Sequence, residues 1–189
     1  MAASALRLTL VEHPSGVTVP AGNRVVYDIR AEQAHFGAAA VGAAALRWEL
    51  TAAGEEPDVL GGTVALAADL APLGGPLVLR CDRIDFPPGG IAYRHTHPGP
   101  GIRRLLFGAI RIDTDGHVTD YGPGGAWFES GPSPVLAHAS ATETSAFARV
   151  MLLPAEWAGK RTIRYVEPAD EEKPKLQRPT VYFDQVIAL

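Results

Sequence analysis

The apolar residues of this chain lie in short runs that proline and glycine separate. Sixteen prolines and twenty glycines divide the 189 residues, a spacing typical of many short strands joined by turns. Runs of β-branched, aromatic and aliphatic residues predict strands at 23–32, 44–52, 76–86, 91–97, 102–113, 126–130, 146–154 and 180–189. The pattern predicts an all-β protein, one sandwich or barrel, with irregular extensions at both ends.

Helix is expected to be scarce. The run GTVALAADLAPL (62–73) predicts one short helix that Pro72 ends, and PAEWAGK (154–160) predicts a single helical turn. Segment 167–179 is charged and rich in proline, which favours a solvated connector. Segment 134–143 is expected to link two strands, and the pair Asp115-Gly116 predicts a hairpin turn.

The strand predicted at 76–86 lacks the alternation of a half-buried strand. Both faces mix apolar and charged residues: one carries Val78, Arg80, Asp82 and Ile84, the other Leu79, Cys81, Arg83 and Asp85. Its β-branched content and the glycine and proline around it predict a strand nevertheless.

Composition limits the classes of function. Apolar residues make up 47% of the chain and charged residues 20%, which is typical of a soluble globular protein. The net charge of −4 and the pI near 5.8 argue against partners such as nucleic acid or an anionic membrane. The single cysteine, Cys81, excludes an intramolecular disulfide and is expected in the core. No signal-like start is visible, so a cytoplasmic location is expected.

The sequence YRHTH holds the first candidate for chemistry. Residues two apart on a strand face the same side, so Tyr93, His95 and His97 are expected to project together. Two such imidazoles can bind one metal ion, each at about 2.0–2.1 Å. By itself a pair of histidines is a permissive pattern, and two polar residues on a strand are the simpler explanation of it.

The spacing of residues around the pair resembles the first signature of the cupin family. Gly89 precedes His95 by six residues, and Gly108 follows His97 by eleven, as in that signature. The resemblance covers 86–112, is weaker over 122–153, and does not extend to residues 1–70 or to the C-terminal tail. It implies a double-stranded β-helix, or jelly-roll barrel, with a ligand site in its mouth.

The same resemblance implies one domain over 1–189. The barrel core would occupy 76–154, with extension strands at 1–75 and a C-terminal extension strand within 155–189. It also implies one divalent metal ion, such as Zn, Fe, Mn or Ni, held by three histidines and a glutamate.

The sequence departs from the family pattern at two of the four ligand positions. Gly101 stands where the first signature places the glutamate. In the second signature, the histidine position falls on Leu136 when counted from Gly125, or on Val135 when counted from Gly124, and the asparagine position on Ser140.

Three other residues are candidates for the site. Glu129 and His138 could replace the missing metal ligands, although Glu129 could instead pair with an arginine and His138 could be a surface residue. Arg103, two residues after Gly101, either binds a ligand's carboxylate, forms an internal salt bridge, or lies on the surface. Tyr93, Arg103 and Glu129 are thus the candidate ligand-binding residues, and His95, His97, Glu129 and His138 the candidate metal ligands.

Three functions stay open at this point. The first is a cupin that binds a small organic acid through a metal ion on His95 and His97, either as a binding protein or as an oxygenase or isomerase. The second is a metal-free module that binds or senses a small molecule, and the third is a structural role with a relic pocket. A homodimer is also expected, because the apolar tail 180–189 must pair with a strand of its own sheet or of a second subunit.

Overall fold

The computed structural model describes residues 5–188 as antiparallel β-structure. The only helical segments in this range are two short 3₁₀ turns, η1 (Ala155–Trp157) and η2 (Pro168–Glu171). The prediction of an all-β fold with little helix is confirmed. No helix of the described residues is long and apolar enough to cross a membrane.

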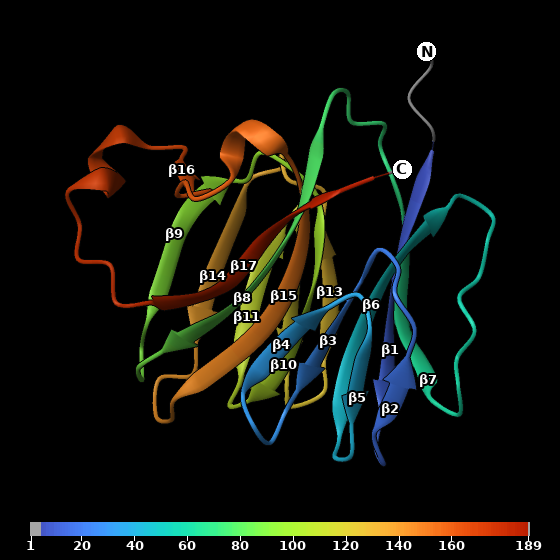
Figure 1. The fold of residues 1–189 in the computed structure, drawn as a ribbon. Helices are drawn as coiled ribbons and strands as arrows, with labels where there is room; N and C mark the ends of the chain where they lie inside the picture. Colours follow the sequence, from blue (N-terminus) through green and yellow to red (C-terminus); the bar gives the residue numbers. More distant parts are fainter. Residues whose placement is uncertain (1–4, 189) are drawn as a thin grey trace.

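Three five-stranded sheets are stacked as layers (Figure 1). The N-terminal sheet has the order β4 (Gln33–Phe36), β3 (Arg24–Asp28), β6 (Ala45–Ala52), β1 (Leu6–His13) and β7 (Thr63–Leu70). The central sheet has the order β13 (Ala126–Glu129), β10 (Gly101–Phe107), β15 (Ser145–Pro154), β8 (Leu77–Phe86) and β17 (Arg178–Ile187). The distal sheet has the order β12 (His117–Tyr121), β11 (Ile110–Thr114), β14 (Val135–Ala139), β9 (Ile91–Thr96) and β16 (Arg164–Tyr165). A small sheet pairs β2 (Val17–Val19) with β5 (Ala39–Val41).

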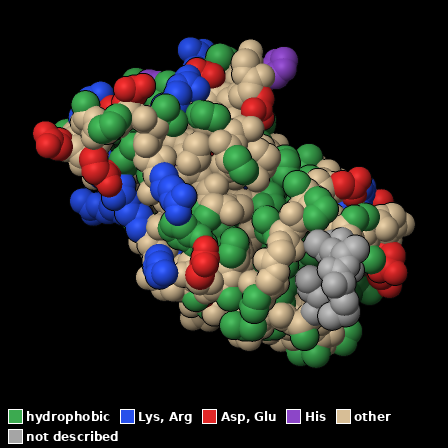
Figure 2. All heavy atoms as spheres, turned by 90° about the horizontal axis from the view of Figure 1, so that it is seen from above, with side chains coloured by type: hydrophobic (Ala, Val, Ile, Leu, Met, Phe, Trp, Pro, Cys, Tyr) green, Lys and Arg blue, Asp and Glu red, His purple; other side chains and the backbone are tan. Residues whose placement is uncertain are grey.

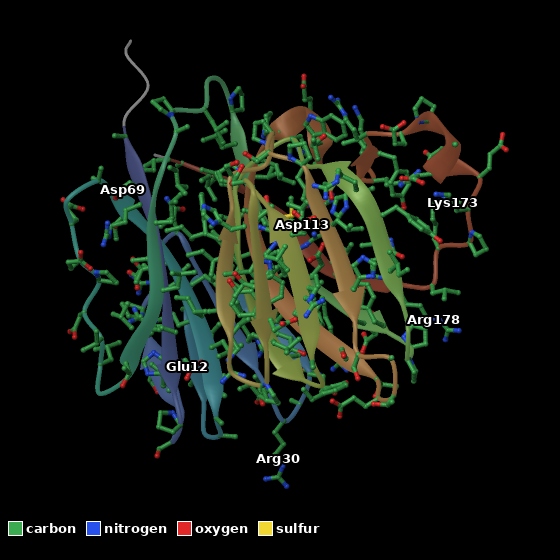
Figure 3. All side chains as sticks on the ribbon, turned by 180° about the vertical axis from the view of Figure 1, so that it is seen from behind. Glu12, Arg30, Asp69, Asp113, Lys173 and Arg178 are labelled. Carbon is green, nitrogen blue, oxygen red and sulfur yellow. The ribbon has the colours of Figure 1, made fainter. Side chains whose placement is uncertain are left out.

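From β8 onward the chain passes back and forth between the central and distal sheets, as in a jelly roll. Each sheet is hydrogen-bonded only within itself, so the two sheets face each other without closing into one continuous barrel. Asp113 lies on the distal sheet and Glu12 on the N-terminal layer across the molecule (Figure 3).

The central sheet is covered on both faces, which explains the mixed pattern of 76–86. Leu79 and Cys81 of β8 share a core with Trp48 of the N-terminal sheet. Ile84 and Phe86 belong to a second core with residues of the distal sheet. A strand that packs against a layer on each side needs no polar face, so it shows no alternation.

The apolar tail pairs with β8 of its own chain over nearly its whole length. Tyr182 packs against Tyr27, and Phe183 against Phe36, with ring centroids 5.6 and 6.2 Å apart. The tail therefore takes the first of the two predicted partners, an edge of its own sheet. Leu189 lies outside the described residues, and the homodimer stays a prediction.

Two predicted elements were wrong. Segment 62–73 is not a helix: Thr63–Leu70 forms β7, because pairing with β1 outweighs the helix propensity of its alanines and leucines. Segment 134–143 is not only a link, since Val135–Ala139 forms β14 between β11 and β9. The predicted strand 102–113 is two strands that separate at Gly108, where φ is +77°.

The surface mixes charges of both signs. Figure 2 shows Lys and Arg side chains beside Asp and Glu on the side of the molecule where β16 lies in Figure 1. Arg161 pairs with Glu171 there at 2.7 Å, and Lys173 pairs with Asp170 at 2.5 Å.

A buried charged cluster lies on the outer face of the N-terminal sheet. Arg47 is ion-paired with Glu49, and its Nε donates to His13 Nε2 at 3.3 Å. Arg47 also donates to the carbonyl oxygen of Asp58 and so fastens the loop after β6. Burial, followed by the neighbouring Arg47 charge, lowers the pKa of His13 below its usual value of 6.5.

This pKa shift predicts the pH dependence of stability. Below about pH 6.5 the unfolded chain binds a proton at His13 that the folded chain does not, so the free energy of unfolding falls as the pH drops from 7 to 5. Substituting His13→Gln should make this fall smaller, whereas His117→Gln, at an exposed histidine of β12, should leave it unchanged. Urea unfolding at each pH measures both, and equal pH slopes in the wild type and His13→Gln would contradict the prediction. His95 and His97 are present in all three proteins, so the comparison isolates His13.

Candidate functional site

A cavity of about 390 Å³ lies between the central and distal sheets. One end of it is polar and carries Asp82, His95, His97, Glu129 and Arg149. The other end is apolar, with lining side chains from Ile84, Phe86, Ala92, Ile112, Trp127, Val135, Ala137 and Phe147. The remaining wall comes from the segments around β16 and the start of β17; Figure 3 labels Lys173 and Arg178 on this side.

His95 and His97 lie side by side at the polar end, as the sequence pattern suggested. Each side chain is 4% exposed, and the ring centroids are 4.8 Å apart. Tyr93 does not line the cavity with them. Val135 pairs with His95, and Ala137 pairs with Ala92. Two residues along β14 therefore correspond to three along β9, so β9 contains one extra residue, a β-bulge. This bulge breaks the alternation and directs Tyr93 away from the cavity, toward Lys173 and Tyr165.

The hydrogen positions at the two imidazoles follow from their fixed partners. His95 Nδ1 lies 2.7 Å from the Tyr93 carbonyl oxygen, which only accepts, so Nδ1 carries the hydrogen and Nε2 of the neutral ring is bare. Arg149 Nη1 lies 3.4 Å from His97 Nε2, and a guanidinium only donates, so this Nε2 is also bare. The two Nε2 atoms are 3.2 Å apart and present two lone pairs to each other.

A proton bound to either Nε2 atom would remove the repulsion between the two lone pairs, but the environment of the rings disfavours protonation. Burial lowers the pKa of His95, and it lowers the pKa of His97 well below the usual range, with a further contribution from the charges of Arg149 and Arg103. Both imidazoles are therefore neutral at pH 7. Since His97 Nε2 accepts from Arg149, His95 Nε2 is the acceptor of this pair without a donor of its own, and His97 Nδ1 has no hydrogen-bond partner among residues 5–188.

Glu129 reaches the same point from the neighbouring strand. It lies directly opposite Gly101 in the pairing of β10 with β13, so its carboxylate stands beside the position where the cupin-like pattern has a glutamate. Its Oε1 accepts a hydrogen bond from Trp127 Nε1 at 2.9 Å, and its Oε2 lies 3.6 Å from His97 Nε2.

Arg103 forms an internal salt bridge, one of the three alternatives that its position allowed. Its Nη2 lies 2.6 Å from Glu129 Oε2, and its Nη1 donates to the Gly101 carbonyl oxygen at 2.7 Å. The side chain is fully buried behind Glu129 and does not line the cavity. Burial lowers the pKa of Arg103 to about 10, against the opposing effect of Glu129, so the guanidinium stays charged.

A second buried ion pair completes the polar end, and the sequence patterns did not single it out. Arg149 Nε and Nη2 donate to the two oxygens of Asp82 at 2.6 and 2.9 Å. These residues are paired across β15 and β8. The signal was present in Arg149, the single charge of β15, because a charge in a strand buried on both faces requires a partner, and β8 carries Asp82.

His138 does not join the other candidates. It is exposed on β14, on the face opposite Val135 and Ala137, which line the cavity. Strand alternation explains this, because Leu136 and His138 point outward when their neighbours point inward. Ser140, at the asparagine position of the cupin-like pattern, lies beyond β14 and does not line the cavity.

The polar end fits a metal ion only in part. Two imidazole nitrogens bound to one tetrahedral ion lie about 3.3 Å apart, close to the 3.2 Å between the Nε2 atoms. Within residues 5–188, however, no three His, Cys, Asp or Glu side chains form a metal-binding group. Glu129 is held by Arg103, and Arg149 places a positive charge beside His97, so the residues do not fit a metal held by three protein ligands.

No protein-family model matches the chain, and no curated protein sequence matches it. Among solved structures, the chain is similar to the polyketide cyclase RemF from Streptomyces resistomycificus, with 21% sequence identity and a TM-score of 0.39. The match covers 50% of this chain and 63% of that one, which is less than two thirds of its length.

Gly101 does not leave open space beside the histidines. A Cβ atom there would lie 2.5 Å from the Val150 carbonyl oxygen and 2.8 Å from Met151 Cγ. Substituting Gly101→Ala should therefore destabilise the protein by about 1–3 kcal/mol, the usual cost of overpacking. Gly74→Ala is the control, since a Cβ atom at Gly74 meets nothing within 4 Å. Thermal unfolding compares the two, and equal stability of both variants would contradict this packing.

Proposed function

We propose that the chain binds a small, largely apolar organic molecule in this cavity, and that a hydroxyl group of the molecule lies between His95 and His97. The observation that carries the proposal is the pair of bare Nε2 atoms 3.2 Å apart. A hydroxyl hydrogen directed at His95 Nε2 supplies a donor to this atom, whereas His97 Nε2 already accepts from Arg149. Burial makes an unmet acceptor costly.

The walls of the cavity support an apolar body for this molecule. The volume of about 390 Å³ falls within the range of small-molecule sites, which are mostly apolar with a few fixed polar groups. Phe86, Trp127 and Phe147 contribute aromatic side chains, and the Trp127 ring lies 5.2 Å from that of Phe147. Flat rings suit such walls because aromatic pairs gain both contact area and favourable geometry.

The charges of the cavity favour a neutral ligand over the carboxylate that the sequence suggested. Arg149 is paired with Asp82, and Arg103 with Glu129, so the polar end carries two positive and two negative charges. Arg80 and Arg161, which also line the cavity, are paired with Asp184 and Glu171. A carboxylate placed between the histidines would meet only arginines that are already paired, and it would face imidazole lone pairs; Lys160 and Lys175 are the other cations in the cavity wall.

A second candidate function keeps the metal. The separation of the two Nε2 atoms suits a divalent ion held by His95 and His97, with a ligand oxygen completing the site. A bound metal ion would supply Lewis acidity. The neighbouring Arg149 makes this candidate the less favoured of the two.

Thermal shift assays with three naphthalenes test the proposal at pH 7. We expect 2-naphthol to raise the melting temperature of the wild type, 2-methoxynaphthalene to raise it much less, and 2-naphthoate to have little effect. At a hundred times the dissociation constant, the stabilisation would be about 2.7 kcal/mol. His95→Leu should abolish the effect of 2-naphthol, and His138→Ala, at the exposed histidine of β14, should retain it.

Each alternative gives a different result. Equal stabilisation by 2-naphthol and its methyl ether would contradict the role of the hydroxyl, whether or not His95→Leu folds. Stronger stabilisation by 2-naphthoate would favour the carboxylate. Stoichiometric metal in the purified wild type and in His138→Ala, lost in the double variant His95→Ala/His97→Ala, would establish the second candidate.

A further inference from the structure

Gln177 places a second unmet acceptor in the wall of the same cavity. Its side chain lines the cavity, and its Oε1 atom is buried without a hydrogen-bond donor among residues 5–188. The nearby cation does not serve it. Lys175 Nζ donates to the carbonyl oxygens of Asp170, Glu171 and Lys173 at 2.6–2.7 Å, which uses all three hydrogens of the ammonium.

The strand register places Gln177 at the apolar end. Arg178 pairs with Asp85, so Gln177 comes level with Phe86, whereas Asp82 pairs with Arg149 at the polar end. Four residues of β8 separate these levels. At 3.3–3.4 Å per residue, the two ends lie roughly 13 Å apart along the strand.

The β8 and β15 wall between the two ends is apolar. Ile84 and Phe86 of β8 face the cavity there, with Phe147 of β15 paired with Ile84. A ligand that satisfies both ends needs a polar group at each end and an apolar body between them. Both groups must donate hydrogen bonds, since the imidazole nitrogens and Gln177 Oε1 all accept.

We infer that Gln177 determines specificity by accepting a hydrogen bond from a second donor at the far end of the ligand. The ligand class is then an elongated apolar molecule with a hydroxyl group at each end. The inference rests on the proposed function, because it assumes that the first hydroxyl lies between His95 and His97. A ligand with only the first hydroxyl leaves Gln177 Oε1 unmet and should bind about fivefold more weakly.

Titration calorimetry with two rods of the same shape tests this inference. The probes are 4-phenylphenol, with one hydroxyl, and 4,4′-dihydroxybiphenyl, with one at each end. A symmetric diol can bind in either of two equivalent orientations, which alone gives it a twofold advantage over the monophenol. We expect the wild type to bind the diol about fivefold more tightly in addition to this factor. Gln177→Met removes the acceptor at similar size and should abolish the preference for the diol.

Two further variants show whether the acceptor oxygen is responsible. Gln177→Glu keeps an acceptor at this position and should keep the preference for the diol. Gln185→Met is the matched control, since Gln185 is an exposed glutamine of β17 whose side chain bonds only to the Val186 carbonyl oxygen. It should behave as the wild type.

The outcomes separate this inference from the proposed function. Suppose that 4-phenylphenol binds and that its binding requires His95. If the wild type then binds the diol no more tightly than the monophenol, or if Gln177→Met still prefers the diol, the role of Gln177 is wrong and the proposed function stands. If neither rod binds, or binding is the same in His95→Leu, the proposed function fails and the inference fails with it.

Discussion

The burial of the central sheet on both faces is the constraint on which the rest of the structure depends. Every charge on β8, β10 and β15 that points toward the distal sheet enters an interior, where an unpaired ion is far less stable than in water. Asp82 and Arg149 meet this constraint across β8 and β15, and Arg103 meets it with Glu129 across β10 and β13. The cavity has a polar end because these pairs are gathered there.

Because the charges at the polar end are paired, His95 Nε2 is the acceptor of the two imidazoles that lacks a donor of its own. Arg149 directs its remaining Nη1 hydrogens at His97, and the Tyr93 carbonyl oxygen fixes the tautomer of His95. Both Nε2 atoms thereby become acceptors, and both are held in place by a rigid sheet. Such preorganisation lowers the entropy that a ligand must lose on binding, so one hydroxyl group can orient a molecule whose affinity comes mostly from apolar contact.

The sequence predicted the fold class and the His95–His97 pair because both depend on local pattern. Turn residues mark the strands, and period-2 alternation from His95 to His97 survives in the structure. Tyr93 was misplaced because the bulge in β9 is a property of its pairing with β14, which no local pattern records. For the same reason β7 appeared helical, since its partner β1 lies more than fifty residues earlier in the chain.

The role of Glu129 shows a related limit. Its place opposite Gly101 follows from the register of β10 with β13. The sequence offered Glu129 either as a replacement carboxylate or as the partner of an arginine such as Arg103, and the structure shows the ion pair with Arg103. Salt bridges across strands depend on which side chains share a face and a level. A one-residue change of register would have separated this pair completely.

The cavity wall consists of sheet strands at the polar end and of a mostly irregular segment, from Gly159 to Gln177, on another side. The polar end rests on long strands of the two sheets, whereas the segment from Gly159 to Gln177 joins the distal sheet by main-chain hydrogen bonds over the short stretch 164–166. Arg80 fastens the start of this segment by donating to the carbonyl oxygens of Trp157 and Lys160. Substitutions, insertions and deletions beyond that anchor disturb few main-chain hydrogen bonds. Descendants of this protein can therefore acquire new ligand lengths by remodelling one surface segment while the chemistry at the histidines is inherited unchanged.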